Sequence, residues 1–326
     1  MNRFLKDWGA MVLIFGLLLL TRFFLPLPFA TEILLFGMYT MACNYLLGWV
    51  GFISFGQPAY LAVGGYASAI YLFYFGTNPW LAILWGILAG IVVTALVGQF
   101  FVRLRSDYFA LVNLAFCVIM YYFLENILKD ITQGDNGLFY IHKIGSTPIL
   151  DLGNPKDLYI AVFGITLLVW IFYRYLDKSF FGACCKATKL NEDKLIFLGY
   201  SSFQIRWLSF IIANTTAALA GSLYAVYFGS MSPDFISYHR AADPVVVTIL
   251  GGVGTLYGPL VGAFAYIGLK DLVSGFFTNW ELLIGVILVA IMLRGEKGIY
   301  GSLAPWLEKR LFSKFPKANP AIKEGS

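Results

Sequence analysis

The stretches Leu47-Gly48-Trp49-Val50-Gly51 and Leu250-Gly251-Gly252-Val253-Gly254 open two glycine-rich segments of an otherwise apolar chain. Each segment, 47–65 and 250–262, contains five glycines and no Asp, Glu, Lys or Arg. Glycine allows a helix to break inside a membrane and two backbones to approach closely, and paired breaks in two halves of a chain point to a transport path. Small residues are also common at ordinary helix interfaces in bilayers, so packing remains an equally good interpretation for any single glycine.

The composition around these segments is that of an integral membrane protein. Hydrophobic residues make up 59% of the chain and charged residues 13%, whereas soluble domains average about 25% charged residues. Several apolar runs are long enough to cross about 30 Å of hydrocarbon as helices. Among them are Trp8–Leu25, Leu81–Phe101, Tyr108–Leu128, Leu158–Tyr173 and Trp207–Phe228. We therefore predict an all-α, polytopic helical membrane protein.

The N-terminal 20 residues combine a basic start with an apolar run, as a signal peptide does. No small-x-small cleavage site follows, and Pro26 and Pro28 suggest a helix exit. We expect a retained first membrane span.

The distribution of positive charge suggests an orientation, because short cytoplasmic loops are enriched in Lys and Arg. If the N-terminus is cytoplasmic, most of the 23 Lys and Arg fall on the cytoplasmic side. The outer side then holds Arg22, Lys129, Lys143, Lys156, Arg240 and Lys270. This topology places the N- and C-termini inside the cell and the polar segment 130–157 outside.

The same topology requires segment 243–273 to enter and leave the membrane from the outer face. Two full spans do not fit in this length, so we predict two short helices joined at the break between Gly254 and Gly258. Asp243-Pro244 suits the start of the first, with Asp243 accepting free backbone N–H groups. A last span is expected to begin near Asn279 and Glu281. We predict one membrane domain over residues 1–300 and a basic cytoplasmic tail over 301–326.

A cytoplasmic excursion over about 178–206 has the features of a short helix. Asn191 suits its N-cap, Glu192 its positive end, and Gly199 a left-handed C-terminus. Leu195, Ile196 and Leu198 leave much of this helix apolar, although it lies outside the hydrocarbon. A helix this short needs a docking surface. It packs either on this protein's own inner surface or in a groove of a soluble partner, and both remain open.

Polar residues in apolar segments mark candidates for a path through the membrane. Ser54, Gln57 and Asn113 are expected to face protein or a water-filled cavity, and hydrogen bonding between helices is the favoured role for each. The remaining candidates for path or gate are Gly56, Gly251, Gly252, Gly254 and Gly258. No paired deep charges are evident, so we expect a low-affinity conduit.

The sequence offers no catalytic or metal-binding pattern. No G-x-x-x-x-G-K-[ST] motif occurs, so we expect no ATP hydrolysis by this chain. Cys43 and Cys117 lie in apolar runs and Cys184-Cys185 are adjacent, and neither spacing suits a metal site. No nucleophile and base converge by spacing, which disfavours an enzyme.

Five stretches, taken in order, resemble the LivM-type permeases of branched-chain amino acid ABC importers. The resemblance extends over about Tyr39 to Gly298. The matching stretches are Ser54-Phe55-Gly56-Gln57 through Gly64-Gly65-Tyr66; Leu104 to Ala110 with Leu114-Ala115-Phe116; Thr132 through Asn136-Gly137-Leu138; Ala187, Glu192 and Leu198-Gly199; and Ser232-Pro233-Asp234-Phe235 with Leu250 to Pro259.

The resemblance implies a type II-like ABC importer permease with about 8–10 transmembrane or re-entrant helices. It implies a bacterial inner-membrane subunit beside a LivH-like second permease, two cytoplasmic ATPases that hold the ATP and Mg, an external substrate-binding protein and membrane lipid, with no nucleic acid. The loop that contains these matches would couple the chain to the ATPases through Ala187, Glu192, Leu195, Leu198 and Gly199.

Glu192 is our candidate for the docking contact, with stabilisation of its own helix as the alternative. Ser106, Cys117, Gln133 and Asp135 depart from the family pattern and leave the substrate open: branched-chain amino acids, or urea and short amides. A stand-alone secondary transporter or channel is the competing class, although no deep Asp, Glu or His for ion coupling is evident in the sequence.

Overall fold

Helices dominate the computed structural model, which describes residues 26–145, 150–237 and 240–275, together with 16, 282, 285–286 and 298–302. The α-helices are α2 (Leu27–Asn44), α3 (Gln57–Ile70), α4 (Pro79–Phe101), α5 (Ser106–Tyr122), α6 (Lys129–Thr132), α7 (Pro155–Lys178), α8 (Phe180–Leu190), α9 (Glu192–Phe197), α10 (Ser202–Phe228), α11 (Asp243–Gly251) and α12 (Gly258–Ser274). Strands β1 (Leu138–Phe139) and β2 (Ser230–Met231) pair antiparallel.

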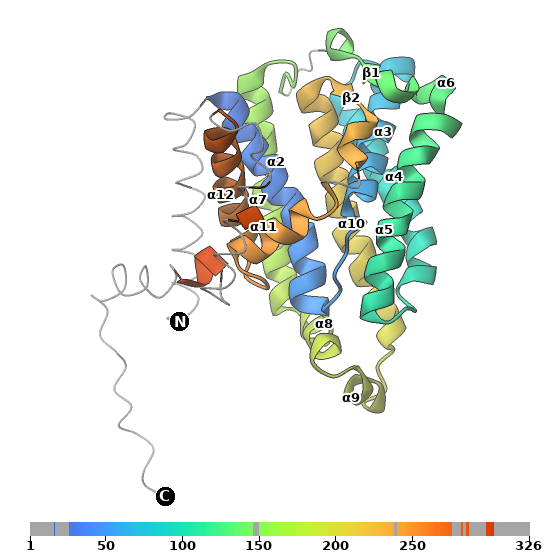
Figure 1. Cartoon of the computed structure of the whole chain (residues 1–326), viewed down its shortest axis with the longest axis vertical. Helices are drawn as coiled ribbons and strands as arrows, with labels where there is room; N and C mark the ends of the chain where they lie inside the picture. The colour runs from blue at the N-terminus through green and yellow to red at the C-terminus, as the bar shows by residue number, and fades with distance from the viewer. Residues whose placement is uncertain are drawn as a thin grey trace, which may run out of the picture.

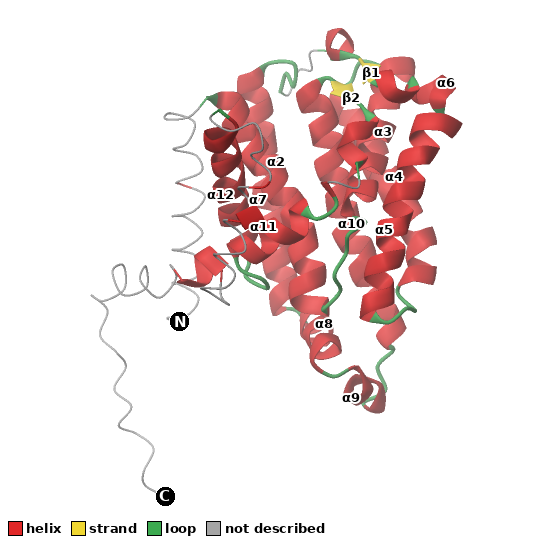
Figure 2. Cartoon of the chain, viewed as in Figure 1, coloured by secondary structure: helices red, strands yellow, loops and turns green. Residues whose placement is uncertain are grey.

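The long helices stand side by side, and the two ends of the bundle differ (Figure 1, Figure 2). The upper end of Figure 1 carries α6, β1 and β2, and the lower end carries α8 and α9. The helical fold predicted from composition is confirmed.

Among the residues that the structure describes, five helices are long and apolar enough to cross a membrane: Leu27–Val50, Pro79–Phe101, Asp107–Ile127, Pro155–Lys178 and Ser202–Phe228. Four of these correspond to spans predicted from the sequence. The fifth begins at α2, which has Pro26 as its N-cap and Pro28 as its second residue, so the two prolines start a helix. Apart from Gly16, the predicted span 8–25 lies outside the described residues.

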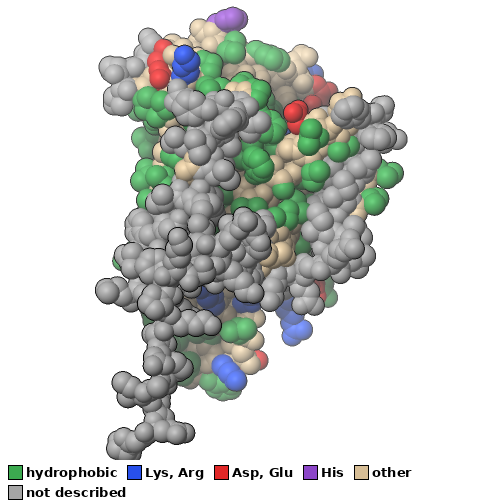
Figure 3. Space-filling view, turned by 90° about the vertical axis from the view of Figure 1, so that its left-hand side faces the viewer, with side chains coloured by type: hydrophobic (Ala, Val, Ile, Leu, Met, Phe, Trp, Pro, Cys, Tyr) green, Lys and Arg blue, Asp and Glu red, His purple; other side chains and the backbone are tan. Residues whose placement is uncertain are grey.

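The spans divide into a central and a peripheral set. In the most apolar 18 residues of each span, the share of buried residues is 83% for the span that starts with α2 and 78% for α10. The share is only 33% for α4 and 28% for the span that contains α5. On the face beside α12, the side view of Figure 3 shows hydrophobic side chains on the described surface between charged groups near the two ends. Helices α2 and α10 therefore form the centre, and α4 and α5 present apolar surface to lipid.

Helix α3 packs on α10 through glycine. A Cβ at Gly64 would lie 2.0 Å from the carbonyl oxygen of Ala218, and one at Gly221 would lie 1.8 Å from that of Leu61. The Ser222 hydroxyl donates to the Gly64 carbonyl across the same contact, at 3.2 Å. Only glycine permits this approach, so this part of the first glycine-rich segment is a packing seam.

The second glycine-rich segment forms the predicted pair of helices. Helices α11 and α12 are joined by residues 252–257, and Asp243 and Lys270 line the same cavity, so the chain returns to the side from which it came. The expected cap is wrong: the N-cap is Ala242, and Asp243 is the first helical residue. The candidate start of a last span at Asn279 and Glu281 lies outside the described residues, as does the tail from 303 onward.

Candidate functional site

The two glycine-rich segments meet at the lower end of α2. A Cβ at Gly48 would lie 2.5 Å from the Cα of Gly254, so the backbones touch. Gly252 and Gly254 have φ angles of 120° and 78°, which side-chain-bearing residues rarely adopt. These two turn the chain from α11 into α12. The resemblance between the segments therefore corresponds to a physical contact.

Asn44, near the end of α2, holds the turn in place. Its side-chain oxygen accepts from the Gly254 amide at 2.7 Å, and its side-chain nitrogen donates to the Thr255 carbonyl at 2.8 Å. The Trp49 indole adds a bond to the Gly254 carbonyl at 3.3 Å. Asn44 is 4% exposed, so these bonds form in a protected environment where their loss is costly.

The other two glycine candidates pack the re-entrant helices together. A Cβ at Gly251 would lie 1.9 Å from the carbonyl oxygen of Gly258. Gly258 in turn begins α12, and its amide donates to the Thr255 hydroxyl at 3.0 Å. All four glycine candidates of the second segment therefore form or support one local structure.

The polar candidates of the first segment gather where α3 begins beside α5. Ser54, Gln57 and Asn113 are each at most 1% exposed. The Asn113 side-chain oxygen accepts a hydrogen bond from the Tyr60 hydroxyl at 3.2 Å. The same oxygen packs against Gly56, where an added Cβ would lie only 2.8 Å from it. Within the described residues, the Ser54 hydroxyl and the Gln57 amide have no hydrogen-bond partner. Their burial agrees with the expectation that these groups face protein or a cavity, and among the described residues Asn113 alone of the three forms the expected interhelical hydrogen bond.

At the lower end, α8 is fastened to the end of α2. The Lys189 ammonium donates to the carbonyls of Leu47 and Gly48, at 3.3 and 2.9 Å. The Tyr45 hydroxyl donates to the Ser209 hydroxyl at 3.1 Å and lies 3.4 Å from the sulfur of Cys185. Burial raises the pKa of the Cys185 thiol. The same backbone that touches Gly254 is thus held from below by α8.

The predicted short helix is α9, and its ends are as expected. The Asn191 side chain accepts from the Lys194 amide at 3.0 Å, and Gly199 has a φ of 85°. Ala187 lies half-buried in the last turn of α8, where its carbonyl accepts from the Asn191 amide. The sequence did not reveal α8 as a separate helix, because the basic residues of 182–190 resemble a solvated loop.

Helix α9 has one buried side and one exposed side. Leu195 is 4% exposed and packs on this protein's own core. Glu192 accepts from the Ser202 hydroxyl at 2.6 Å and forms a salt bridge with Arg206, which ties α9 to the start of α10. Both residues therefore have intramolecular partners. The exposed apolar side chains at this tip are Leu190, Ile196, Phe197 and Leu198.

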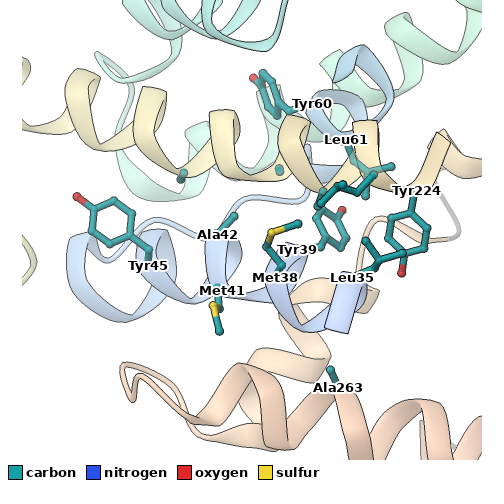
Figure 4. Packing of buried hydrophobic residues seen from close by; sticks show 14 of the residues in the cluster. Leu35, Met38, Tyr39, Met41, Ala42, Tyr45, Tyr60, Leu61, Tyr224 and Ala263 are labelled. Atoms are coloured by element: carbon teal, nitrogen blue, oxygen red, sulfur yellow. The ribbon is translucent and has the colours of Figure 1, made fainter. Parts of the chain in front are cut away.

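A cavity of about 640 Å³ opens between α2, α3, α10 and α12 on the side of the upper end. Its lining includes Glu32, Asp243, Arg240 and Lys270, so both signs of charge surround it. This cluster of charges was not predicted, because its residues come from three separate parts of the chain: α2, the start of α11 and the end of α12. Arg240 is exposed, so the expectation of no deep paired charges stays a prediction. Figure 4 shows Tyr39, Leu61 and Tyr224 converging from α2, α3 and α10 beside it.

Comparison with known proteins places this architecture in a family. The family model for the permease component of branched-chain amino acid transport systems matches residues 25–292. The high-affinity branched-chain amino acid transport permease LivM of Salmonella typhimurium is 26% identical over 304 residues, covering 86% of this chain and 71% of the relative. The corresponding LivH protein of Escherichia coli is 24% identical, covering 84% of this chain and 93% of the relative. No solved structure gives a significant match.

Proposed function

We propose that this chain, which belongs to the family of branched-chain amino acid transport system permease components, forms half of the translocation path of an ATP-driven importer. The other half would be a LivH-like permease. Two cytoplasmic ATPases would bind the ATP and Mg, and an external binding protein would deliver branched-chain or related small amino acids. The names of its relatives support the substrate class.

The observation that carries this proposal is the exposed apolar tip of α9. Phe197 is 90% exposed and Leu198 74%, at the end of the bundle that the charge distribution assigns to the cytoplasm. An apolar tip outside the hydrocarbon fits a groove in a soluble partner, as an ATPase subunit would provide. The tip is held by α8 and by the salt bridge of Glu192 with Arg206, so a partner that moves it also moves α10.

A second connection leads from this tip to the re-entrant turn. Helix α8 leads into α9 and holds the carbonyl of Gly48 through Lys189. Gly48 touches Gly254, at the turn between α11 and α12. Movement of the ATPases would therefore reach the spans along α10 and the re-entrant turn through Gly48, which is how a docked helix transmits a two-state change.

Substitution of the exposed tip tests the proposal. In a complex reconstituted with its ATPases and binding protein, we expect Phe197→Ser to weaken co-purification of the ATPase and to reduce ATP-driven leucine uptake about tenfold, because the apolar contact is lost. Phe139→Ser is the matched control, since Phe139 is 69% exposed at the opposite end. Equal effects of the two substitutions on ATPase binding would contradict the docking role.

Transport by the wild type separates the remaining alternatives. ATP-driven uptake of urea or acetamide in preference to leucine would identify an amide permease of the same family. Gradient-driven uptake by this chain alone, without ATP, would identify a secondary transporter and overturn the proposed function.

A further inference from the structure

The charged residues around the outer cavity include two that lack a partner. The side chains of Glu32 and Arg240 form neither a hydrogen bond nor a salt bridge with any residue that the structure describes. Both lie close enough to Tyr224 to interact with it electrostatically, and all three line the cavity. A carboxylate and a guanidinium are thus present in the same part of the cavity without neutralising each other.

A third polar group of the cavity also lacks a partner. Tyr39 is 4% exposed, and its hydroxyl has no hydrogen-bond partner among the described residues. A buried polar group without a partner costs about 1–3 kcal/mol, so such a group calls for an explanation. A ligand that bonds these groups would provide that explanation.

Aromatic rings form the apolar part of the lining. Phe36 stacks on Tyr266 with ring centroids 5.6 Å apart, and Tyr224 stacks on Phe228 at 5.8 Å. All four rings border the cavity. Its volume of about 640 Å³ lies within the range of about 300–1,000 Å³ that is typical of small-molecule sites.

We propose that this cavity binds a free α-amino acid with an apolar side chain. Glu32 binds the α-ammonium, Arg240 binds the α-carboxylate, and the aromatic rings contact the side chain. An α-amino acid carries its ammonium and its carboxylate on the same carbon atom, so it needs one acidic and one basic partner close together. Urea and short amides have neither charge and would leave both groups unpaired. This inference rests on the proposed function and assigns its substrate class to a site in this chain.

Binding of leucine and two truncated analogues tests this assignment. The probes are L-leucine, 4-methylpentanoate, which lacks the ammonium, and 3-methylbutylamine, which lacks the carboxylate. Equilibrium binding is measured by calorimetry on the permease pair with its ATPases, in lipid nanodiscs and without the binding protein. We expect the wild type to prefer leucine over each analogue by about tenfold or more, which corresponds to at least about 1.4 kcal/mol.

Each charge is then removed separately. In Glu32→Gln the preference for leucine over 4-methylpentanoate should fall about tenfold, while its preference over 3-methylbutylamine persists. Arg240→Gln should give the opposite result. Asp130→Asn and Lys129→Gln remove exposed charges on α6, away from the cavity, and should change neither preference. If Glu32→Gln fails to assemble, Glu32→Asp keeps the charge and should weaken leucine binding while retaining both preferences.

The outcomes separate this inference from the proposed function. A complex that imports leucine with ATP but shows no leucine binding, or the same preferences in all variants, overturns the cavity assignment alone. Stronger binding of acetamide than of leucine also overturns it. A chain that neither assembles with ATPases nor imports leucine overturns the proposed function.

Discussion

The two glycine-rich segments share a composition but use their glycines differently. In the first, 47–65, the glycines serve separate contacts: Gly48 meets the re-entrant turn, Gly56 meets Asn113, and Gly64 meets α10. In the second, 250–262, Gly251, Gly258 and Gly262 pack against one another. The first segment therefore joins distant parts of the bundle, and the second builds a local unit.

This difference explains how similar segments arise without a duplicated site. Both follow a descending helix and precede an ascending one, so they run in the same direction, whereas an inverted repeat needs opposite directions. They meet through Gly48 and Gly254 because a Cβ at Gly48 would lie 2.5 Å from the Cα of Gly254, while Gly254 itself is needed for its φ of 78°. Their resemblance reflects shared packing chemistry at one interface.

The largest effect is expected from Gly64→Ala, compared with Gly251→Ala. Each added methyl would overlap a carbonyl oxygen, at 2.0 Å for Gly64 and 1.9 Å for Gly251. Overpacking costs about 1–3 kcal/mol or more. Because Gly64 lies in the seam between α3 and α10, we expect the larger fall in melting temperature there, measured on the complex in lipid nanodiscs. Gly251→Ala should abolish transport with a smaller change in melting temperature.

Two glycines with open space around them provide controls. A Cβ at Gly164 or at Gly268 meets no atom within 4 Å. Gly164→Ala and Gly268→Ala should leave the melting temperature and the transport rate near those of the wild type. If Gly251→Ala lowers the melting temperature as much as Gly64→Ala does, the second segment is part of the global bundle and the distinction fails.

Local signals in the sequence were enough to predict most of the fold. Apolar runs located four of the spans, and Asn191 and Gly199 marked the ends of α9, because capping depends on neighbouring residues. The break before Gly258 was predictable for the same reason. Helix α2 was not singled out, since its many buried residues resemble both a core helix and a membrane span.

The cavity and the internal role of Glu192 depend on distant residues and were not predictable. Glu192 and Arg206 are 14 residues apart in the sequence, and only the fold brings their side chains together. Glu32 and Arg240 lie far apart in the chain, and neither was assigned a role in binding. Glu32 could have been singled out, because a charged residue within an apolar run often has a function. Polar residues within spans could be identified, but their partners could not.

A smaller and more local effect is expected at Asn44, which bridges the two segments. Asn44→Ala removes the bonds to the Gly254 amide and the Thr255 carbonyl and leaves both groups unpaired. A loss of about 1–3 kcal/mol corresponds to amide exchange faster by about fivefold to a hundredfold over 252–257. Hydrogen–deuterium exchange measures this change. Asn126→Ala, at an exposed amide in the upper part, serves as the control; unchanged exchange at the turn would show that glycine contacts alone hold it.

The smallest effect on stability is expected at Lys189, where α8 holds the first segment from below. Lys189→Met keeps the apolar stem beside Gly51 but removes the ammonium from the carbonyls of Leu47 and Gly48. A cation at a helix C-terminus contributes about 0.3–1 kcal/mol, so the melting temperature should barely change. Because this contact connects α8 to the backbone that touches Gly254, we expect fewer leucine molecules imported per ATP hydrolysed. Lys194→Met, an exposed substitution on α9, is the matched control. If Lys189→Met and Lys194→Met import the same amount of leucine per ATP, movement of the ATPases reaches the spans through α10 alone. The contact between Gly48 and Gly254 then serves only to pack the two segments together.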